Sequence, residues 1–128
     1  MGLGPRKVGP VAAAELLRLA AQVERDLLAA GIRARPYDVS GDRSDAWAGV
    51  EVEVDEFDDP AGGVWLHWKL PVELDESILL GTGEVHAPLA AGVVALLNAL
   101  GYVAAPGQDS LRPYAVKVHG GPIGRDSA

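Results

Sequence analysis

Residues 46–71 read AWAGVEVEVDEFDDPAGGVWLHWKLP and contain the clearest structural pattern in the chain. In both halves of this stretch the even-numbered positions are apolar, and most of the positions between them are charged or polar. Alternation with a period of two predicts strands that bury one face. The turn-forming sequence DDPAGG separates the two halves and is short enough to join neighbouring strands. We therefore predict an antiparallel hairpin with one face in the core.

The other face of this hairpin, here called the outer face, gathers charged and aromatic side chains. Its members are Glu51, Glu53 and Asp55 on the first strand and Trp65, His67 and Lys69 on the second. Opposite charges on neighbouring strands contribute roughly 0.2–1 kcal/mol per pair. Carboxylates can steer a partner and an exposed tryptophan can anchor it. We predict that the outer face is open to solvent and binds another protein.

Other interpretations of the outer face stay open from the sequence. Trp65 could be covered by the chain itself, and residues 72–87 are then the predicted cover. His67 among carboxylates could form a metal site or an acid–base pair, although we favour a solvated charge cluster. His86 and His119 show no spacing that joins them to His67. We therefore predict no metal, no cofactor and no catalytic residue.

Amphipathic helices are predicted on both sides of the hairpin. Over residues 11–30, polar and apolar side chains recur every three or four positions on opposite stripes. The polar stripe is Glu15, Arg18, Gln22 and Arg25, and the apolar stripe is Leu16, Ala20, Val23 and Leu27. A second helix is predicted over residues 88–100. Each helix has a proline near its start and a glycine after its end, where these residues are favoured.

The chain turns from helix to strand in the same way twice. Residues 27–36 read LLAAGIRARP, and residues 96–106 read LLNALGYVAAP. In each stretch the glycine suits the left-handed conformation that ends a helix. The proline that follows cannot donate to a strand ladder, so it should end its strand or keep it at a sheet edge.

A further alternating stretch at residues 114–119 predicts the last strand. The order is then helix, three strands, helix and two strands. This order predicts one α+β domain over residues 1–128, with two helices on one face of an antiparallel sheet of about five strands. Residues 1–8 and 120–128 are predicted to be flexible tails, because they lack periodic apolar residues.

The second predicted helix is apolar on all sides, and Asn98 is its single polar side chain. A helix on a sheet needs only one apolar stripe, so a second neighbour should cover the other side. The predicted sheet-facing row is Leu89, Val93, Leu96 and Leu100, and the predicted second face is Ala91, Val94, Ala95 and Asn98. The first helix, residues 72–87 or a second copy of the chain could supply the cover. We predict a homodimer, the commonest soluble assembly.

Composition restricts the partners. The chain has 128 residues, 18 acidic against 11 basic residues, a formal charge of −7 and no cysteine. Nucleic acid binding needs clustered positive charge, so we predict a protein partner instead. No apolar stretch reaches the roughly 20 residues that span a bilayer, and no secretory leader is recognisable, so we predict no membrane association and a cytoplasmic protein.

The layout resembles the YbjN and type III secretion chaperone-like families. The likeness rests on a helix that ends in Ala-Gly-Ile at residues 30–32, a strand pair that leads into Leu70-Pro71, and a later helix with Leu-Leu-Asn at residues 96–98. It covers residues 11–119. The resemblance implies a protein-binding accessory that dimerises and has no active site.

The sequence therefore predicts a non-catalytic protein-binding or chaperone-like accessory domain. One alternative is a small enzyme or ligand-binding protein with a pocket between the loop at residues 72–87 and the hairpin at residues 47–70. A second alternative is an acidic immunity protein or nucleic-acid mimic, which the charge alone suggests.

Overall fold

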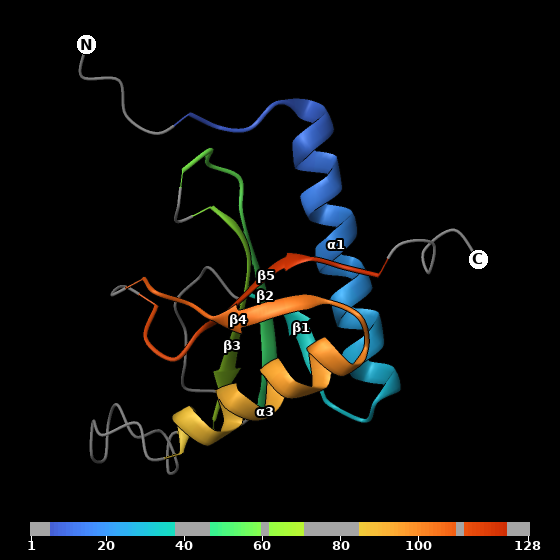
Figure 1. Cartoon of the computed structure of the whole chain (residues 1–128), viewed down its shortest axis with the longest axis vertical. Helices are drawn as coiled ribbons and strands as arrows, with labels where there is room; N and C mark the ends of the chain where they lie inside the picture. Colours follow the sequence, from blue (N-terminus) through green and yellow to red (C-terminus); the bar gives the residue numbers. More distant parts are fainter. Residues whose placement is uncertain (1–5, 38–46, 60–61, 71–84, 110–111, 123–128) are drawn as a thin grey trace.

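The computed structural model describes residues 6–37, 47–59, 62–70, 85–109 and 112–122. In these residues two helices lie on one face of a five-stranded sheet (Figure 1). The elements are α1 (Pro10–Ala29), β1 (Ala34–Pro36), β2 (Gly49–Asp55), β3 (Gly63–Lys69), α3 (His86–Ala99), β4 (Val103–Pro106) and β5 (Val116–Gly120). The α+β class and the predicted order of helices and strands are confirmed.

The sheet is mixed, whereas the prediction was a purely antiparallel one. Its strand order is β1-β2-β3-β5-β4, and β1 pairs with β2 in parallel while the other neighbours are antiparallel. A tight turn can join only antiparallel strands, and a parallel pair needs a connection of about a dozen residues or more. Residues 37–48 form a connection of that length between β1 and β2. The two strands can therefore run in the same direction.

The two helix-to-strand corners have the same geometry. Gly31 has a φ of 87° and Gly101 a φ of 98°, so both occupy the left-handed region as predicted. The next residue then donates back into the helix: Ile32 N to Leu27 O and Tyr102 N to Leu97 O, each at 2.9 Å. These bonds satisfy carbonyl groups that the helix end would leave unpaired. The strands that follow, β1 and β4, are the two sheet edges and end at prolines, which confirms that prediction.

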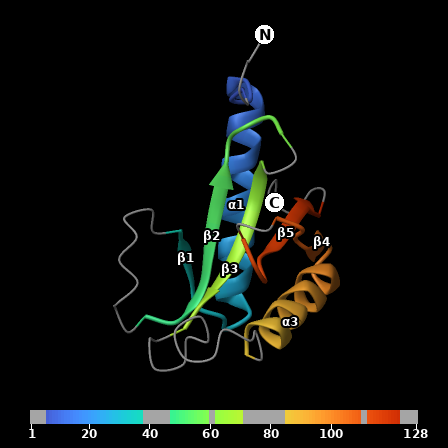
Figure 2. The ribbon, with the colours of Figure 1, turned by 90° about the vertical axis from the view of Figure 1, so that its left-hand side faces the viewer.

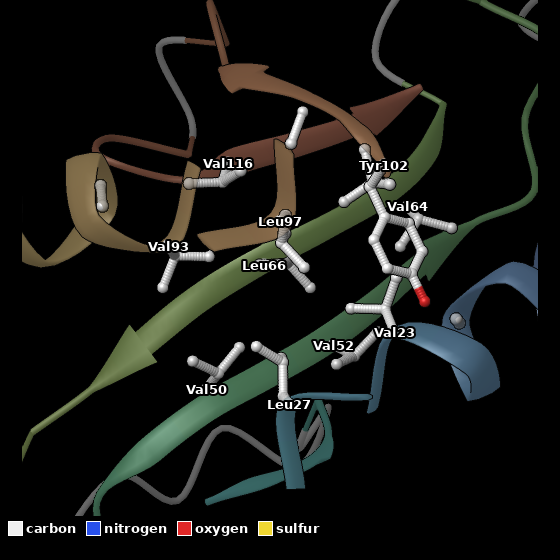
Figure 3. Packing of buried hydrophobic residues seen from close by; sticks show 14 residues of the cluster. Val23, Leu27, Val50, Val52, Val64, Leu66, Val93, Leu97, Tyr102 and Val116 are labelled. Atoms are coloured by element: carbon white, nitrogen blue, oxygen red, sulfur yellow. The ribbon is translucent and has the colours of Figure 1, made fainter. Parts of the chain in front are cut away.

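The core lies between the sheet and both helices (Figure 3). The even-numbered residues of the hairpin supply one side of it, with Val50, Val52, Val64 and Leu66 all nearly inaccessible to solvent. Val23 and Leu27 of α1 and Val93 and Leu97 of α3 fill the space above them. Tyr102 joins this core and donates its hydroxyl to Asp26 Oδ2 at 2.5 Å, so the buried carboxylate of α1 has a partner.

The buried row of α3 differs from the predicted row. Val93 faces the core as expected, and Leu96 and Leu100 pack against it while half-buried. The other buried residues of the helix are Ala90 and Leu97, which the predicted row did not include. An all-apolar helix carries no polar stripe to indicate its rotation. The rotation depends instead on the segments that pack against α3, which bury Ala90, Val93 and Leu97 in the common core.

The described inner ends of the predicted tails, residues 6–8 and 120–122, contact the rest of the domain. Val8 N donates to Glu56 O at 2.7 Å, and Asp58 N donates to Arg6 O at 2.6 Å, so Arg6 to Val8 lie along the end of the hairpin. At the other end, Gly120 belongs to β5, and Gly121 packs so closely that a Cβ there would lie 3.1 Å from Tyr102. The part of each predicted tail nearest the domain is therefore not free. The rest of the two tails, residues 1–5 and 123–128, lies outside the described chain.

Candidate functional site

The hairpin register brings the side chains predicted for the outer face together. Glu51 lies opposite His67, and Glu53 lies opposite Trp65. The predicted exposure is wrong for half of the set, because Trp65 is 2 % exposed, Glu51 0 % and Lys69 3 %. The outer face is therefore a partly buried layer of polar and aromatic groups, in which Glu53, Asp55 and His67 keep some exposure.

One half of this layer is covered by Arg35 of β1 and by Trp47, which precedes β2. Arg35 Nη2 donates to Glu51 Oε2 at 2.9 Å, and its Nε donates to the same oxygen at 3.1 Å. The Arg35 guanidinium lies 4.1 Å from the centre of the Trp47 ring, and the Trp47 carbonyl accepts from Lys69 Nζ at 2.7 Å. Glu51 cannot steer a partner from this position, since it is fully enclosed.

The other half is organised by Arg112, which sequence analysis did not identify. Arg112 and the carboxylates that it contacts, Glu53, Asp55 and Asp109, are called the arginine network below. Arg112 Nε and Nη2 donate to the two oxygens of Glu53, both at 3.0 Å. Its Nη2 also donates to Asp55 at 2.7 Å, and its Nη1 to Asp109 at 2.6 Å. One guanidinium thus donates to three carboxylates.

His67 joins the arginine network and does not act as an isolated base. Its Nε2 lies 2.7 Å from Glu53 Oε1, and the Tyr37 ring packs against it with 4.8 Å between ring centres. Burial alone would raise the pKa of Glu53, but hydrogen bonds from His67 and Arg112 outweigh burial and hold that pKa at about 2. A carboxylate with so low a pKa is a poor proton acceptor at neutral pH. Within the described residues, no group of three or more His, Asp or Glu side chains is placed to hold a metal ion.

Trp65 is covered by the segment between β4 and β5. The Gly107 backbone lies so close to the indole that a Cβ at Gly107 has no room, and Gly107 N is held by Ala115 O at 2.8 Å. The Arg112 guanidinium stacks 4.6 Å from the Trp65 ring, with Lys117 Nζ at 5.2 Å. The alternative in which the chain itself covers Trp65 is therefore correct, but this cover lies around Gly107 and Arg112. The predicted cover, residues 72–87, falls mostly outside the described chain.

The predicted dimer face of α3 is only partly available. Val94 packs against the core, and Asn98 Oδ1 accepts from Ala104 N at 3.0 Å, so both contact their own domain. Ala91 and Ala95 are exposed, together with Gly92 between them. Asn98 therefore ties this helix to β4, and the exposed part of the predicted face consists of small side chains.

A cleft lies beside the N-terminal half of α1. In Figure 2 this half of the helix runs alongside the tip of the β2–β3 hairpin. The cleft, called the α1 cleft below, has a volume of about 720 Å³ and is open to solvent. Its lining residues come from α1, from the β2–β3 turn and from the chain that leaves β5: Val8, Ala12, Glu15, Leu16, Arg18, Leu19, Gln22, Phe57, Asp58, Asp59, Gly62, Gly63, His119, Gly120, Gly121 and Pro122.

Gln22 is the unusual residue of the α1 cleft. The sequence pattern placed it on the polar stripe, but it is only 6 % exposed, and among the described residues its Nε2 has no hydrogen-bond partner. Leaving a buried donor unpaired costs roughly 1–3 kcal/mol. Gln22 also lines the cleft, so the unpaired donor belongs to a side chain in the cleft wall.

Several charged side chains of the α1 cleft have no ion-pair partner within the described chain, unlike the carboxylates of the outer face. Glu15 and Asp58 make no ion pair within the described chain, and neither do Arg18 and His119. On the outer face, each carboxylate of the arginine network contacts Arg112. The α1 cleft is therefore the part of the described surface where a cavity, free charges and an unpaired buried donor coincide.

The residues that organise both regions carried little signal in the sequence. Gln22 follows the three- and four-residue spacing of Glu15 and Arg18 and is indistinguishable from them in a period analysis. Arg112 lies between two alternating stretches and has no period at all. One indirect signal existed for it: the predicted outer face had three acids and a single lysine, so a further cation was needed for balance.

Comparisons with protein-family models, with curated proteins and with solved structures found no match. Neither helix in the described part of the chain is long and apolar enough to cross a membrane.

Proposed function

We propose that this chain is a non-catalytic protein-binding accessory domain that takes a segment of its partner into the α1 cleft. The observation that carries this proposal is the buried, unpaired amide of Gln22 in the wall of an open cleft. Folded proteins rarely leave such donors unsatisfied, and a bound chain offers acceptors at every residue.

The chemistry of the outer face supports a non-catalytic role. The charged groups there form ion pairs with one another, as Arg112 does with Glu53. The low pKa of Glu53 suits an ion pair better than proton transfer. The same pairing weakens the proposal of an acidic mimic, because Arg35 and Arg112 balance the acids that such a surface would present. The proposed enzyme pocket beside residues 72–87 lies largely outside the described chain and stays a prediction.

Affinity capture from a native lysate tests this function. The protein and an Ala12→Trp variant are used as baits, and bound proteins are identified by mass spectrometry. Ala12 is exposed on α1 and lines the cleft, so the indole should fill the entrance with little effect on stability. We expect a specific partner on the wild-type bait and at least tenfold less of it on the variant. The control is Ala14→Trp, which adds the same ring on an exposed helix position outside the cleft. Equal capture by both variants would contradict binding in the cleft.

Homodimerisation and a cytoplasmic location complete the proposal. Exposed Ala91, Gly92 and Ala95 leave room for close approach of a second α3. Sedimentation equilibrium of the purified chain should give a mass twice the 13.3 kDa of one copy. A concentration-independent mass of one copy would contradict the dimer and leave the α1 cleft unaffected.

A further inference from the structure

We infer that the α1 cleft binds an extended peptide segment with basic side chains, supplied by the partner protein. The inference rests on the function proposed above and names the chemistry of the segment. It follows from the donors and acceptors that line the cleft and from their spacing along α1.

Both donors and acceptors line the cleft. Gln22, Arg18 and His119 carry N–H groups, which need acceptors such as peptide carbonyl groups. Glu15 and Asp58 are acceptors. A small polyamine would satisfy the carboxylates and leave the buried Gln22 amide unpaired. A peptide with lysine or arginine satisfies both sets, because it carries a carbonyl at every residue and cations on some side chains.

The spacing along the helix suits an extended chain. Glu15 and Gln22 are seven residues apart, which corresponds to about 10 Å along a helix axis. An extended peptide covers this distance in about three residues. If a peptide carbonyl accepts from Gln22, a basic residue about three positions away in the peptide lies beside Glu15. Apolar side chains of the peptide between these two points then contact Leu16, Leu19 and Phe57.

The charge and shape of the surroundings agree with this occupant. The chain as a whole has a formal charge of −7, which attracts a cationic segment over distances near 10 Å at moderate salt. The cleft is open, so a segment can enter and leave it at its ends. Addition of a strand to the hairpin end is a poorer fit, because Arg6 to Val8 already pair with residues 56–58 there.

Selection from a random heptapeptide phage library tests the inference. The wild-type protein is the target, and phage that also bind the Ala12→Trp variant are removed beforehand. We expect the selected peptides to carry two or more Lys or Arg residues. Synthetic copies, measured by fluorescence anisotropy at low salt, should bind at least tenfold more weakly to Gln22→Met and to the Glu15→Gln/Asp58→Asn double variant. Glu24→Gln, which removes an acid from the same helix outside the cleft, should bind as the wild type does.

Two further measurements keep the outcome decisive. Gln22→Met should raise the melting temperature of the free protein, since methionine fills similar space without the unpaired donor. Two results would overturn the inference and indicate an acidic patch that binds cations non-specifically. One is an unchanged peptide affinity in Gln22→Met. The other is equal displacement of the peptide by spermidine in the wild type and in this variant. Selection of acidic or purely apolar peptides that bind only when the cleft is open would overturn the inferred basic character of the segment. It would leave the proposed function intact. Absence of any cleft-dependent peptide, with lysate capture insensitive to Ala12→Trp, would overturn both.

Discussion

Replacing Trp65 with serine is expected to lower the free energy of unfolding by about 3–5 kcal/mol, as other large-to-small changes of buried aromatic residues do. The indole is 2 % exposed and is enclosed by the Gly107 backbone, Arg112 and Lys117. Serine would leave a cavity and would remove the ring over which the Arg112 guanidinium stacks. This effect is much larger than the roughly 1 kcal/mol expected for an exposed binding residue.

Urea titration followed by circular dichroism measures this change. Phe57→Ser is a suitable control, because Phe57 is also aromatic but is 42 % exposed, and it should cost about 1 kcal/mol or less. A Trp65 variant as stable as the Phe57 variant would contradict the burial of Trp65 and restore the outer face as a candidate binding surface.

Features set by neighbouring residues were predictable from the sequence. The alternation of Val50 and Val52 with acids identified the core face of β2, and Gly31 and Gly101 identified both helix ends. Each of these patterns reflects local geometry: the two-residue period of a strand, or the left-handed conformation that glycine tolerates. Local geometry acts on every chain with that pattern, so the prediction needs no knowledge of distant contacts.

Features set by distant contacts were not predictable. Glu53 meets Arg112 across 59 positions of sequence, and no local pattern indicates that the segment around Arg112 folds over the outer face. The parallel pairing of β1 with β2 and the rotation of α3 are also decided by where other segments pack. Alternation correctly separated the two faces of the hairpin, but it does not distinguish a polar face in water from a polar face beneath another segment.

The same limit applies to the candidate site. Gln22 has the spacing of a solvent-facing residue, but it is buried in the wall of a cleft that α1, the β2–β3 turn and the chain after β5 form together. A buried glutamine on a predicted polar stripe is visible only once these three segments are placed together. The sequence therefore pointed to the outer face, where charged and aromatic residues alternate in a recognisable pattern. The residues of the α1 cleft follow the pattern of any amphipathic helix and gave no such signal.

Arg112→Gln is expected to destabilise the protein at neutral pH by about 3 kcal/mol or more, because loss of one partner leaves the other charges of a largely buried network uncompensated. Arg112 contacts three carboxylates and has a side chain only 14 % exposed. The matched control is Arg25→Gln, since Arg25 is 59 % exposed and its nearest approach to Asp26 is 3.9 Å. That exposed pair should contribute at most about 1 kcal/mol.

The effect of Arg112→Gln should depend on pH in a defined direction. The pKa of Glu53 is lowered from 4.5 to about 2, so its ionised form stabilises the fold above about pH 4.5, and this stabilisation is lost as the pH falls towards 2. A lowering of this size corresponds to about 3 kcal/mol. Without Arg112 the pKa of Glu53 should move back towards its ordinary range, and the variant should lose less stability between pH 4.5 and pH 2 than the wild type does. Urea titrations at several pH values should therefore converge for the two proteins in acid, whereas parallel curves would show that Arg112 stabilises the fold by packing on Trp65 alone.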